Sequence, residues 1–358
     1  MTSGQYNARV NEDILMPQST DRYRMPPEWA PHQGTWLSWP HNRETWSGCL
    51  SEAEAALTLA VAALAESETV HINVLDAAHR TAVAARFAKT VAPGRVQFHL
   101  IPTNDAWCRD HGAIFAFDSN DALVALDFRF NAWGEKYRPF DADDAAAARM
   151  ADALGVRTVR VDRVLEGGSI DVNGAGAVLT TEQCLLNPNR NPQMTRHDIE
   201  AMLARYLGTP DVCWLGDGIV GDDTDGHIDD LTRFVDETTL VTVVEPNTRD
   251  ANHAALAENR KRLDDLRLSD GRALSVVELP MPSPLIHGDR GRLPASYANF
   301  YIGNDVVLLP VFDAPQDAQA IDVLSNCFRS RRVVPIDCRA LVVGLGTLHC
   351  LTQQVPVK

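Results

Sequence analysis

The sequence lacks a long apolar run, a Cys-x-x-Cys pair and a surplus of positive charge. Lys and Arg number 33 against 48 Asp and Glu, which gives a formal charge of −15 over 358 residues. Nucleic acids and anionic membranes attract basic surfaces, so this charge argues against both as partners. No run approaches the ~18 apolar residues that a membrane-spanning helix needs. The 7 widely spaced cysteines argue against a structural zinc site. Together with the lack of an apolar signal peptide, they predict a reduced, cytoplasmic protein.

Helix and strand patterns alternate along most of the chain, which is typical of the α/β class. Residues 1–22 carry neither pattern and predict a flexible tail. The first helical stretch begins with Ser51 and Glu54 in a capping-box pattern. Helices are predicted at 51–66, 77–90, 141–154, 195–207, 250–268 and 315–328. An apolar strand follows each one, at 69–75, 96–101, 156–161, 212–215, 274–279 and 332–336.

The loops after the strands carry the side chains suited to chemistry. Five markers lie about 60 residues apart along the chain: Asp110, Glu166, His227, His287 and Cys350. This spacing predicts helix-strand-loop-strand units whose loops gather at one end of a ring. The reactive groups would then meet at that end.

Cys350 is the candidate nucleophile. It ends the segment Gly344-Leu345-Gly346-Thr347-Leu348-His349-Cys350, in which small residues clear the approach to the thiol. A thiol with a pKa of about 8.5 is mostly protonated at neutral pH, so it needs a histidine, a dipole or a cationic substrate beside it. The candidate base is His227, which lies among the aspartates of 222–230. A thiol, a histidine and clustered carboxylates together favour attack on a cationic substrate.

Each of these residues also has a simpler interpretation. Cys350 alone would more often be a small buried hydrophobe. Asp110 follows an arginine and fits a surface ion pair, and Glu166-Gly167-Gly168 fits a turn. The aspartates of 222–230 fit a hard-cation site or a solvated acidic loop, although they lack the pattern of a 12-residue calcium loop.

Seven motifs occur in an order that resembles the agmatine deiminase and bacterial peptidylarginine deiminase family over nearly the whole chain. They are Met25-Pro26-Pro27-Glu28-Trp29, Thr35-Trp36-Leu37-Ser38-Trp39-Pro40, Trp107-Cys108-Arg109-Asp110, Glu166-Gly167-Gly168, Asp223-Thr224-Asp225-Gly226-His227-Ile228-Asp229, Tyr297-Ala298-Asn299-Phe300-Tyr301 and His349-Cys350-Leu351-Thr352-Gln353-Gln354. The resemblance implies the pentein fold, an α/β propeller of five pseudo-symmetric ββαβ-type units around a central active site. It also implies one catalytic domain at 23–358.

The resemblance assigns a role to each reactive residue. Asp110 and Asp229 would hold a guanidinium, whose fork of N–H donors matches two carboxylates. Cys350 would attack the central carbon, and His227 would protonate the departing ammonia and then activate water. Glu166 would orient His227 and raise its pKa. Neither a metal nor an organic cofactor is expected.

The preferred substrate prediction is agmatine. No evident pair of arginines that would hold a substrate carboxylate follows Asp110, whereas acidic and aromatic residues suit a second cation. Arg129, Arg138, Arg290 and Arg292 remain as other sources of such a clamp. The expected substrate contacts are Trp39, Trp107, Asp223 and Asn299, with Trp133 as a further aromatic. Alternatives are a deiminase of peptidyl or free arginine and, more remotely, a metal-dependent hydrolase or an inactive binding protein. A homodimer is a further expectation.

Overall fold

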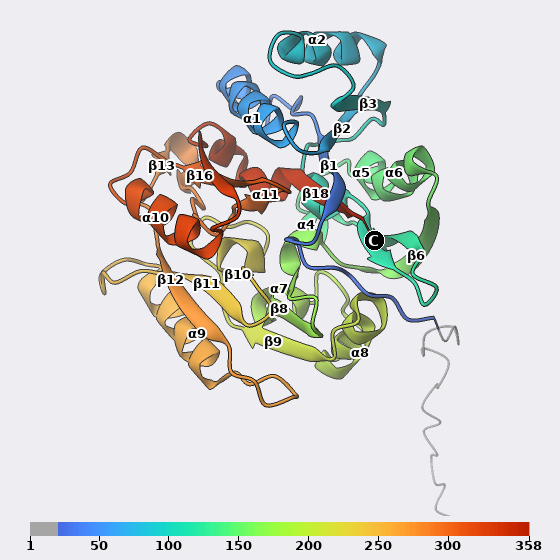
Figure 1. Ribbon diagram of the computed structural model, residues 1–358. Coiled ribbons are helices and arrows are strands. Elements are labelled where there is room, and N and C mark those ends of the chain that lie inside the picture. The colour runs from blue at the N-terminus through green and yellow to red at the C-terminus, as the bar shows by residue number, and fades with distance from the viewer. Residues whose placement is uncertain (1–20, 358) are drawn as a thin grey trace, which may run out of the picture.

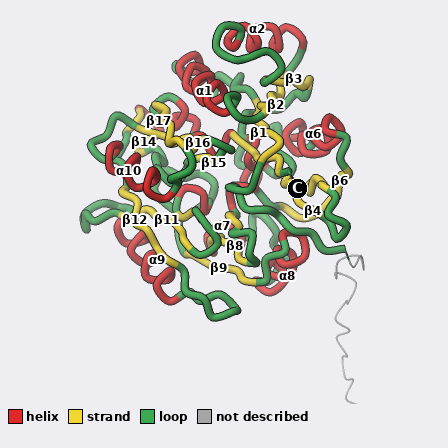
Figure 2. The backbone as a smooth tube through the Cα atoms, in the orientation of Figure 1, coloured by secondary structure: helices red, strands yellow, loops and turns green. Residues whose placement is uncertain are grey.

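The computed structural model describes residues 21–357, so the predicted tail lies outside the described residues except for its last two positions. Helices lie mainly on the outside of the molecule, and strands and loops lie toward the middle (Figures 1 and 2). The short helix α11 (Leu348–Leu351) and strand β18 (Thr352–Pro356) lie near the centre of this view. The C-terminal segment therefore brings Cys350 to the interior of the fold.

Five sheets share one pairing pattern. In each, the first strand is antiparallel to the second, and the second is parallel to the third. Four of these sheets consist of β4 (Ile114–Phe117), β5 (Leu123–Arg129) and β6 (Arg157–Val164); β7 (Asp171–Val172), β8 (Ala177–Thr181) and β9 (Asp211–Leu215); β10 (Thr232–Phe234), β11 (Thr239–Val244) and β12 (Ser275–Pro280); and β15 (Tyr301–Ile302), β16 (Val306–Val311) and β17 (Arg332–Asp337). The fifth contains β18, β1 (His32–Ser38), β2 (Thr69–Val74) and β3 (Val96–Leu100).

A helix separates the second strand from the third in every one of these sheets, because parallel neighbours require a crossover connection. The crossover helices are α1 (Leu50–Leu64), α6 (Ala146–Leu154), α8 (Arg196–Leu207), α9 (His253–Asp265) and α10 (Asp317–Cys327), and α2 (Ala77–Phe87) leads from β2 to β3. The six predicted helices are confirmed with small shifts at their ends. The helix predicted over 141–154 is interrupted at Ala145, which separates α5 (Asp141–Asp144) from α6.

The predicted capping box at the start of α1 is wrong. The helix begins at Leu50 after Cys49, and no side chain caps it. Ser51 lies inside the first turn, where its hydroxyl donates to Glu52 instead. A capping box does occur at α8, where Thr195 and Asp198 bond each other's backbone N–H groups.

The two ends of the described chain meet in one sheet. Strand β18 runs antiparallel to β1, with Thr352 opposite Leu37. The Thr352 hydroxyl also donates to the Leu348 carbonyl at 2.8 Å, which ties β18 back to the short helix α11. The nucleophile segment is thus held between a strand pairing and a buried helical turn.

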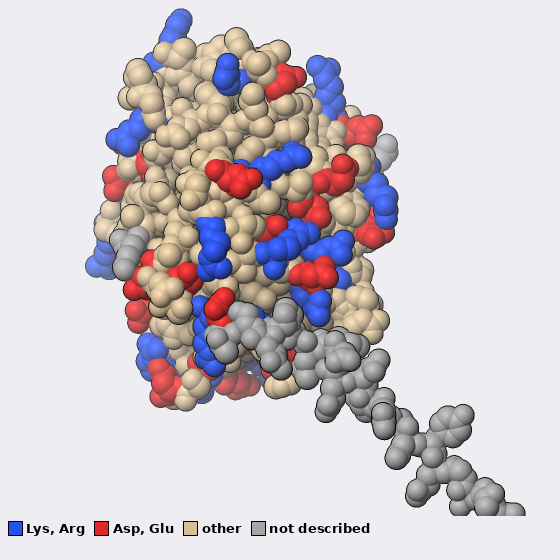
Figure 3. All heavy atoms as spheres, turned by 90° about the vertical axis from the view of Figure 1, so that its right-hand side faces the viewer, with Lys and Arg blue, Asp and Glu red and all other residues tan. Residues whose placement is uncertain are grey.

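No helix among residues 21–357 is both long and apolar enough to cross a membrane. On the face drawn in Figure 3, basic and acidic side chains are interspersed, and no broad basic patch gathers there. This face therefore lacks the electrostatic footprint that nucleic-acid backbones select.

Candidate active site

Short helical turns just before the first strand of each sheet carry the reactive residues. These turns are α3 (Cys108–His111) before β4, the 3-10 turn Gly167–Ser169 before β7, the 3-10 turn Ile228–Asp230 before β10, and α11 before β18. The fourth unit contributes Asn299, which lies just before β15. It does not contribute the marker His287, which lies in the hairpin strand β13 (Ile286–His287). Equivalent positions in five units therefore surround one site.

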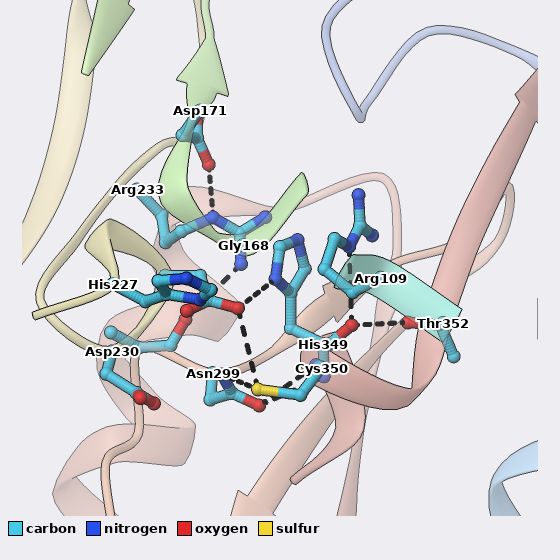
Figure 4. Close-up of polar contacts among 12 residues, drawn as sticks. Arg109, Gly168, Asp171, His227, Asp230, Arg233, Asn299, His349, Cys350 and Thr352 are labelled. Carbon is cyan, nitrogen blue, oxygen red and sulfur yellow. Dashed lines mark hydrogen bonds and ion pairs between the residues drawn. The ribbon is translucent and has the colours of Figure 1, made fainter. Parts of the chain in front are cut away.

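The Cys350 thiol is buried at the centre of this site (Figure 4). Asn299 Nδ2 donates to Cys350 Sγ at 3.1 Å, and Asp229 Oδ2 lies 3.6 Å from the sulfur. Burial raises the pKa of the Cys350 thiol well above its usual range, and the carboxylates of Asp229, Asp230 and Asp110 raise it further. A cationic substrate would reverse the electrostatic part of this shift, so the thiol is suited to activation by the substrate itself.

Gly168 forms one wall of the site and brings three side chains around a single point. A Cβ atom placed there would lie 2.6 Å from His227 Nδ1, 2.7 Å from Asp110 Oδ1 and 3.2 Å from Asp229 Oδ2. The Gly168 amide also donates to Asp110 Oδ1 at 2.9 Å. Both carboxylates are therefore close enough to hold one guanidinium, well inside the ~10 Å limit for such a pair.

Gly168 was not among the predicted site residues, although its place in the Glu-Gly-Gly motif is the signal that identifies it. We expect Gly168→Ala to lower kcat/KM by about 100-fold or more, because the methyl group would occupy the space between the reacting groups. Steady-state kinetics and a thermal melt measure the effect. Gly216→Ala is the matched control, since its nearest neighbour would be 3.3 Å away and the site is not involved. Retention of more than a tenth of the activity by Gly168→Ala would contradict this role.

Asp110 is held by an unusual backbone segment. Trp133 Nε1 donates to Asp110 Oδ2 at 3.0 Å. Trp133 and its neighbours Ala132 and Glu135 have positive φ values of 55°, 51° and 64°, a conformation that costs energy in residues other than glycine. The segment is thus shaped to present the indole N–H to the carboxylate. Burial raises the pKa of Asp110 to about 6, with further contributions from Asp229 and Glu166 and an opposing one from His227.

His227 is fully buried, and its Nδ1 lies 3.7 Å from Asp110 Oδ1. Burial alone would lower its pKa, but Asp110, Cys184 and Asp229 together raise it well above the usual histidine range. The expected orienting bond from Glu166 is not found among the described residues. Glu166 Oε1 instead accepts from Arg190 Nε at 2.7 Å. Asp110, rather than Glu166, is the main source of the raised pKa.

A buried chain of charged groups supports Asp229, and sequence reasoning missed it. His349 Nδ1 lies 2.7 Å from Asp229 Oδ2, and His349 Nε2 lies 2.8 Å from Glu28 Oε2. Each ring nitrogen of His349 therefore lies within hydrogen-bond distance of a carboxylate oxygen. Although burial would raise the pKa of Asp229, the bond from His349 holds it below its usual range. His349 therefore serves the carboxylate and does not contact the neighbouring thiol.

Glu28 anchors this chain of charges from the N-terminal motif. Its carboxylate also pairs with Arg109 at 3.1 Å and with Arg233 at 3.0 Å, and Arg233 in turn pairs with Asp171. Arg233, His349 and Arg109 outweigh the effect of burial and lower the pKa of Glu28 well below its usual range. Glu28 pairs with His349 although the two residues are about 320 positions apart in the sequence. The N-terminal motif Met25-Pro26-Pro27-Glu28-Trp29 therefore supports the active site through this pairing.

Two predicted substrate contacts are placed differently by the structure. The prediction for Trp39 is wrong: its indole N–H donates to Glu54 at 2.8 Å and its ring packs edge-on against Phe87, so it is a core residue between α1 and α2. The Asn299 amide bonds Cys350 Sγ, and its oxygen accepts from Thr347 Oγ1 at 2.7 Å. Asn299 therefore positions the nucleophile.

A cavity of about 680 Å³ lies beside the reacting groups, and Trp107, Trp133 and Asp223 are among its lining residues. Trp107 is also close to the nucleophile, since a Cβ atom on Gly346 would lie 2.7 Å from Trp107 and 3.1 Å from Cys350 Sγ. Asp223 accepts from the Tyr137 hydroxyl at the outer part of the cavity. The predicted contacts Trp107 and Asp223 are thus in reach of a substrate tail.

Basic residues line the cavity, and two of them, Arg138 and Arg290, are among the arginines considered as sources of a clamp. The cavity lining includes Arg43, Lys136, Arg138 and Arg290. Three of them are already engaged: Lys136 with Asp225 at 2.9 Å, Arg138 with Glu135, and Arg290 with the carbonyl of Val343 at 2.8 Å. The residues considered in the sequence as other sources of a clamp, Arg129 and Arg292, pair with Asp162 and Asp250.

A buried thiol, a cationic histidine and two carboxylates around one point define a site for attack on a planar cation, in the class of enzymes that modify guanidines. Residues 24–356 match the family model described as Porphyromonas-type peptidyl-arginine deiminase, and the chain belongs to that family. It is 36% identical to the agmatine deiminase of Ectopseudomonas mendocina over 94% of this chain and 96% of the relative.

Solved structures give the same relationship. The agmatine deiminase of Enterococcus faecalis superposes with a TM-score of 0.87 at 31% identity, covering 93% of this chain and 96% of that one. A C. jejuni agmatine deiminase variant with substrate bound superposes with a TM-score of 0.85 at 32% identity, covering 95% and 98%. These matches confirm that the chain has the α/β fold of this deiminase family.

Proposed function

We propose that this chain is an agmatine deiminase, a hydrolase that converts agmatine and water to N-carbamoylputrescine and ammonia, as in putrescine synthesis. The observation that carries the proposal is the convergence of Asp110, His227 and Asp229 on the point in front of Gly168, with Cys350 Sγ 3.6 Å from Asp229. The relatives named above support the choice of agmatine. Five sheets with one strand order support a five-unit propeller in a single domain at 23–358.

The guanidinium binds between Asp110 and Asp229, which orients its central carbon toward Cys350. Its positive charge offsets the carboxylates that disfavour the thiolate, so the Cys350 proton is lost to solvent when the substrate binds. Attack forms a C–S bond and a tetrahedral adduct. His227 donates its proton to one nitrogen, the C–N bond breaks, and ammonia departs.

The resulting S-alkylthiouronium is hydrolysed in the second half of the reaction. Neutral His227 removes a proton from water as the water oxygen bonds to the carbon. The C–S bond then breaks, the Cys350 thiolate leaves, and a ureido group remains on the product. The raised pKa of His227 suits the first proton transfer, and release of ammonia leaves the ring ready for the second.

The pH dependence of the free enzyme should report Asp110. We expect kcat/KM to be lost as the pH falls through about 6, because protonated Asp110 no longer attracts the guanidinium. The corresponding fall in kcat should occur at lower pH, because the bound cation favours the ionised form of Asp110. Profiles of kcat/KM and kcat for agmatine measure both limbs. A kcat/KM that does not change between about pH 5 and pH 7 would contradict the assignment.

Selectivity should favour agmatine over free arginine. Arginine adds a carboxylate near Asp223, and three of the four basic residues at the cavity already have partners. Because an unpaired buried carboxylate costs several kcal/mol, we expect a preference of about 100-fold in kcat/KM. Comparison of agmatine, arginine and a peptide with a C-terminal arginine measures it.

The second candidate function is deimination of free or peptidyl arginine. The basic lining of the cavity favours it, because Arg43 has no partner among the described contacts and could meet a carboxylate. Equal kcat/KM values for agmatine and arginine would select this candidate. A cytoplasmic site of action and a homodimer are further parts of the proposal, and gel filtration of the purified chain tests the dimer.

A further inference from the structure

Cys184 is a buried thiol that the reaction does not use. It lies in the short helix α7 (Glu182–Leu185), where its amide donates to the Thr181 hydroxyl at 3.1 Å. A sulfur atom from Cys184, a carboxylate oxygen from Glu166 and a ring nitrogen from His227 all lie within 4.8 Å of one another. Each of these three side chains is 0% exposed. A second thiol is therefore placed against the histidine that serves Cys350.

Two members of this cluster have buried polar atoms with no hydrogen-bond partner among the described residues. Arg190 engages Glu166 Oε1, but Glu166 Oε2 has no partner. The ring of His227 contacts Asp110 at 3.7 Å and adjoins the Cys184 thiol, but neither ring nitrogen makes a regular hydrogen bond to a described oxygen or nitrogen atom. Unpartnered buried polar atoms are rare in native proteins because each costs free energy. Their presence in one cluster indicates that these atoms are available to a ligand.

The donor set fits a borderline divalent cation. Zn²⁺ takes thiolate, imidazole and carboxylate ligands at about 2.0 to 2.3 Å in tetrahedral geometry, which separates the ligand atoms by roughly 3.3 to 3.8 Å. Atoms within 4.8 Å of one another need to approach by only about 1 Å to reach this geometry. The charge also fits: the Cys184 thiolate and the carboxylates of Glu166 and Asp110 balance the two positive charges of the cation and the one of Arg190, which pairs with Glu166.

We propose that Glu166, Cys184 and His227 form an inhibitory site for a Zn²⁺-class cation, with water as the fourth ligand. Binding forms a metal–sulfur bond and a metal–nitrogen bond, and it releases to solvent both the Cys184 proton and the proton of the His227 nitrogen that binds the metal. The metal-bound nitrogen of His227 then carries no proton, so the ring cannot become the imidazolium that protonates ammonia. The inhibition rests on the proposed role of His227, whereas the binding does not.

Cobalt(II) provides a direct probe, because Co²⁺ takes the same ligands as Zn²⁺ and a Co²⁺–thiolate bond absorbs in the near ultraviolet. The starting protein is Cys350→Ala, which removes the other thiol near His227. We expect this variant to give the charge-transfer band at one equivalent of Co²⁺. Cys350→Ala with Cys184→Ser should lose the band, and the matched control, Cys350→Ala with Cys213→Ser, should keep it. Cys184→Ala replaces the serine variant if circular dichroism shows that it does not fold.

Inhibition by Zn²⁺ gives the second readout. Each rate is normalised to that of the metal-free protein. Zn²⁺ should inhibit the otherwise unaltered chain. Inhibition of Cys184→Ser should require at least about 30-fold more Zn²⁺, because the variant lacks the thiolate ligand. A band that survives in the Cys184→Ser double variant, or that requires Cys350, would overturn the proposal. Absence of agmatine turnover in the unaltered chain, with the Co²⁺ band present in Cys350→Ala, would instead count against the proposed function alone.

Discussion

Cys350→Ala is expected to abolish turnover of agmatine, with a loss of at least about 10⁴-fold in kcat. The reason is that no other described thiol meets the two carboxylates and His227: Asn299 and Asp229 are the neighbours of Cys350 Sγ, at 3.1 and 3.6 Å. Alanine also replaces a buried thiol whose ionisation is disfavoured by burial and by the neighbouring carboxylates when no substrate is bound. The protein should therefore remain folded.

Mass spectrometry supplies the second part of this test. Acid quenching during turnover should trap an amidino adduct on the peptide that contains Cys350. Cys108→Ala is the internal control, because Cys108 is buried in an apolar cluster with Trp36 and Met150, and burial raises its pKa to about 12. This control should keep its activity. Retention of a tenth of the original rate by Cys350→Ala would sink the nucleophile assignment.

Asp229→Asn should cost at least about 3 kcal/mol in transition-state stabilisation, roughly 150-fold in kcat/KM. The change removes the negative charge that pairs with the substrate cation, and it also replaces the carboxylate that His349 Nδ1 meets at 2.7 Å with an amide. Asp110→Asn should have an effect of similar size for the first reason alone. Steady-state kinetics with agmatine measures both.

Asp230→Asn is the matched control for this prediction. Asp230 is the next residue and is equally buried, but burial and the neighbouring charges of Asp229 and Asp222 raise its pKa well above the usual range. Asp230 is not among the side chains that meet in front of Gly168, and asparagine is nearly isosteric with aspartate, so the change should alter kcat/KM by less than about threefold. An equal loss in Asp229→Asn and Asp230→Asn would contradict the assignment of the guanidinium to Asp229.

Local signals in the sequence were sufficient to predict the helices and the positions of the reactive turns. Helical periodicity identified α8 and α10, and the sixty-residue spacing placed Asp110, His227 and Cys350 in equivalent turns. These features depend on short-range patterning, which a single sequence retains. The error at Ser51 has a local cause as well, because a shift of the helix start by one residue moves a capping side chain into the first turn.

The supporting contacts of the site could not be predicted in the same way. The pairing of Glu28 with His349 joins residues at opposite ends of the chain, and it depends on the meeting of β1 and β18 in one sheet. Trp39 directly follows β1, in which every residue from Gly34 to Ser38 is buried, so no alternation of exposed and buried positions indicates where its side chain points. The role of Gly168 follows from its neighbours in space, His227 above all.

The most direct test of the account is the product formed from agmatine in ¹⁸O-labelled water. Attack by Cys350 followed by hydrolysis predicts one ammonia for each N-carbamoylputrescine and one ¹⁸O atom in its ureido group. Mass spectrometry of the product and an ammonia assay measure both in a single reaction. Release of ammonia without a labelled ureido product, or transfer of the amidino group to an added amine, would contradict the deiminase mechanism.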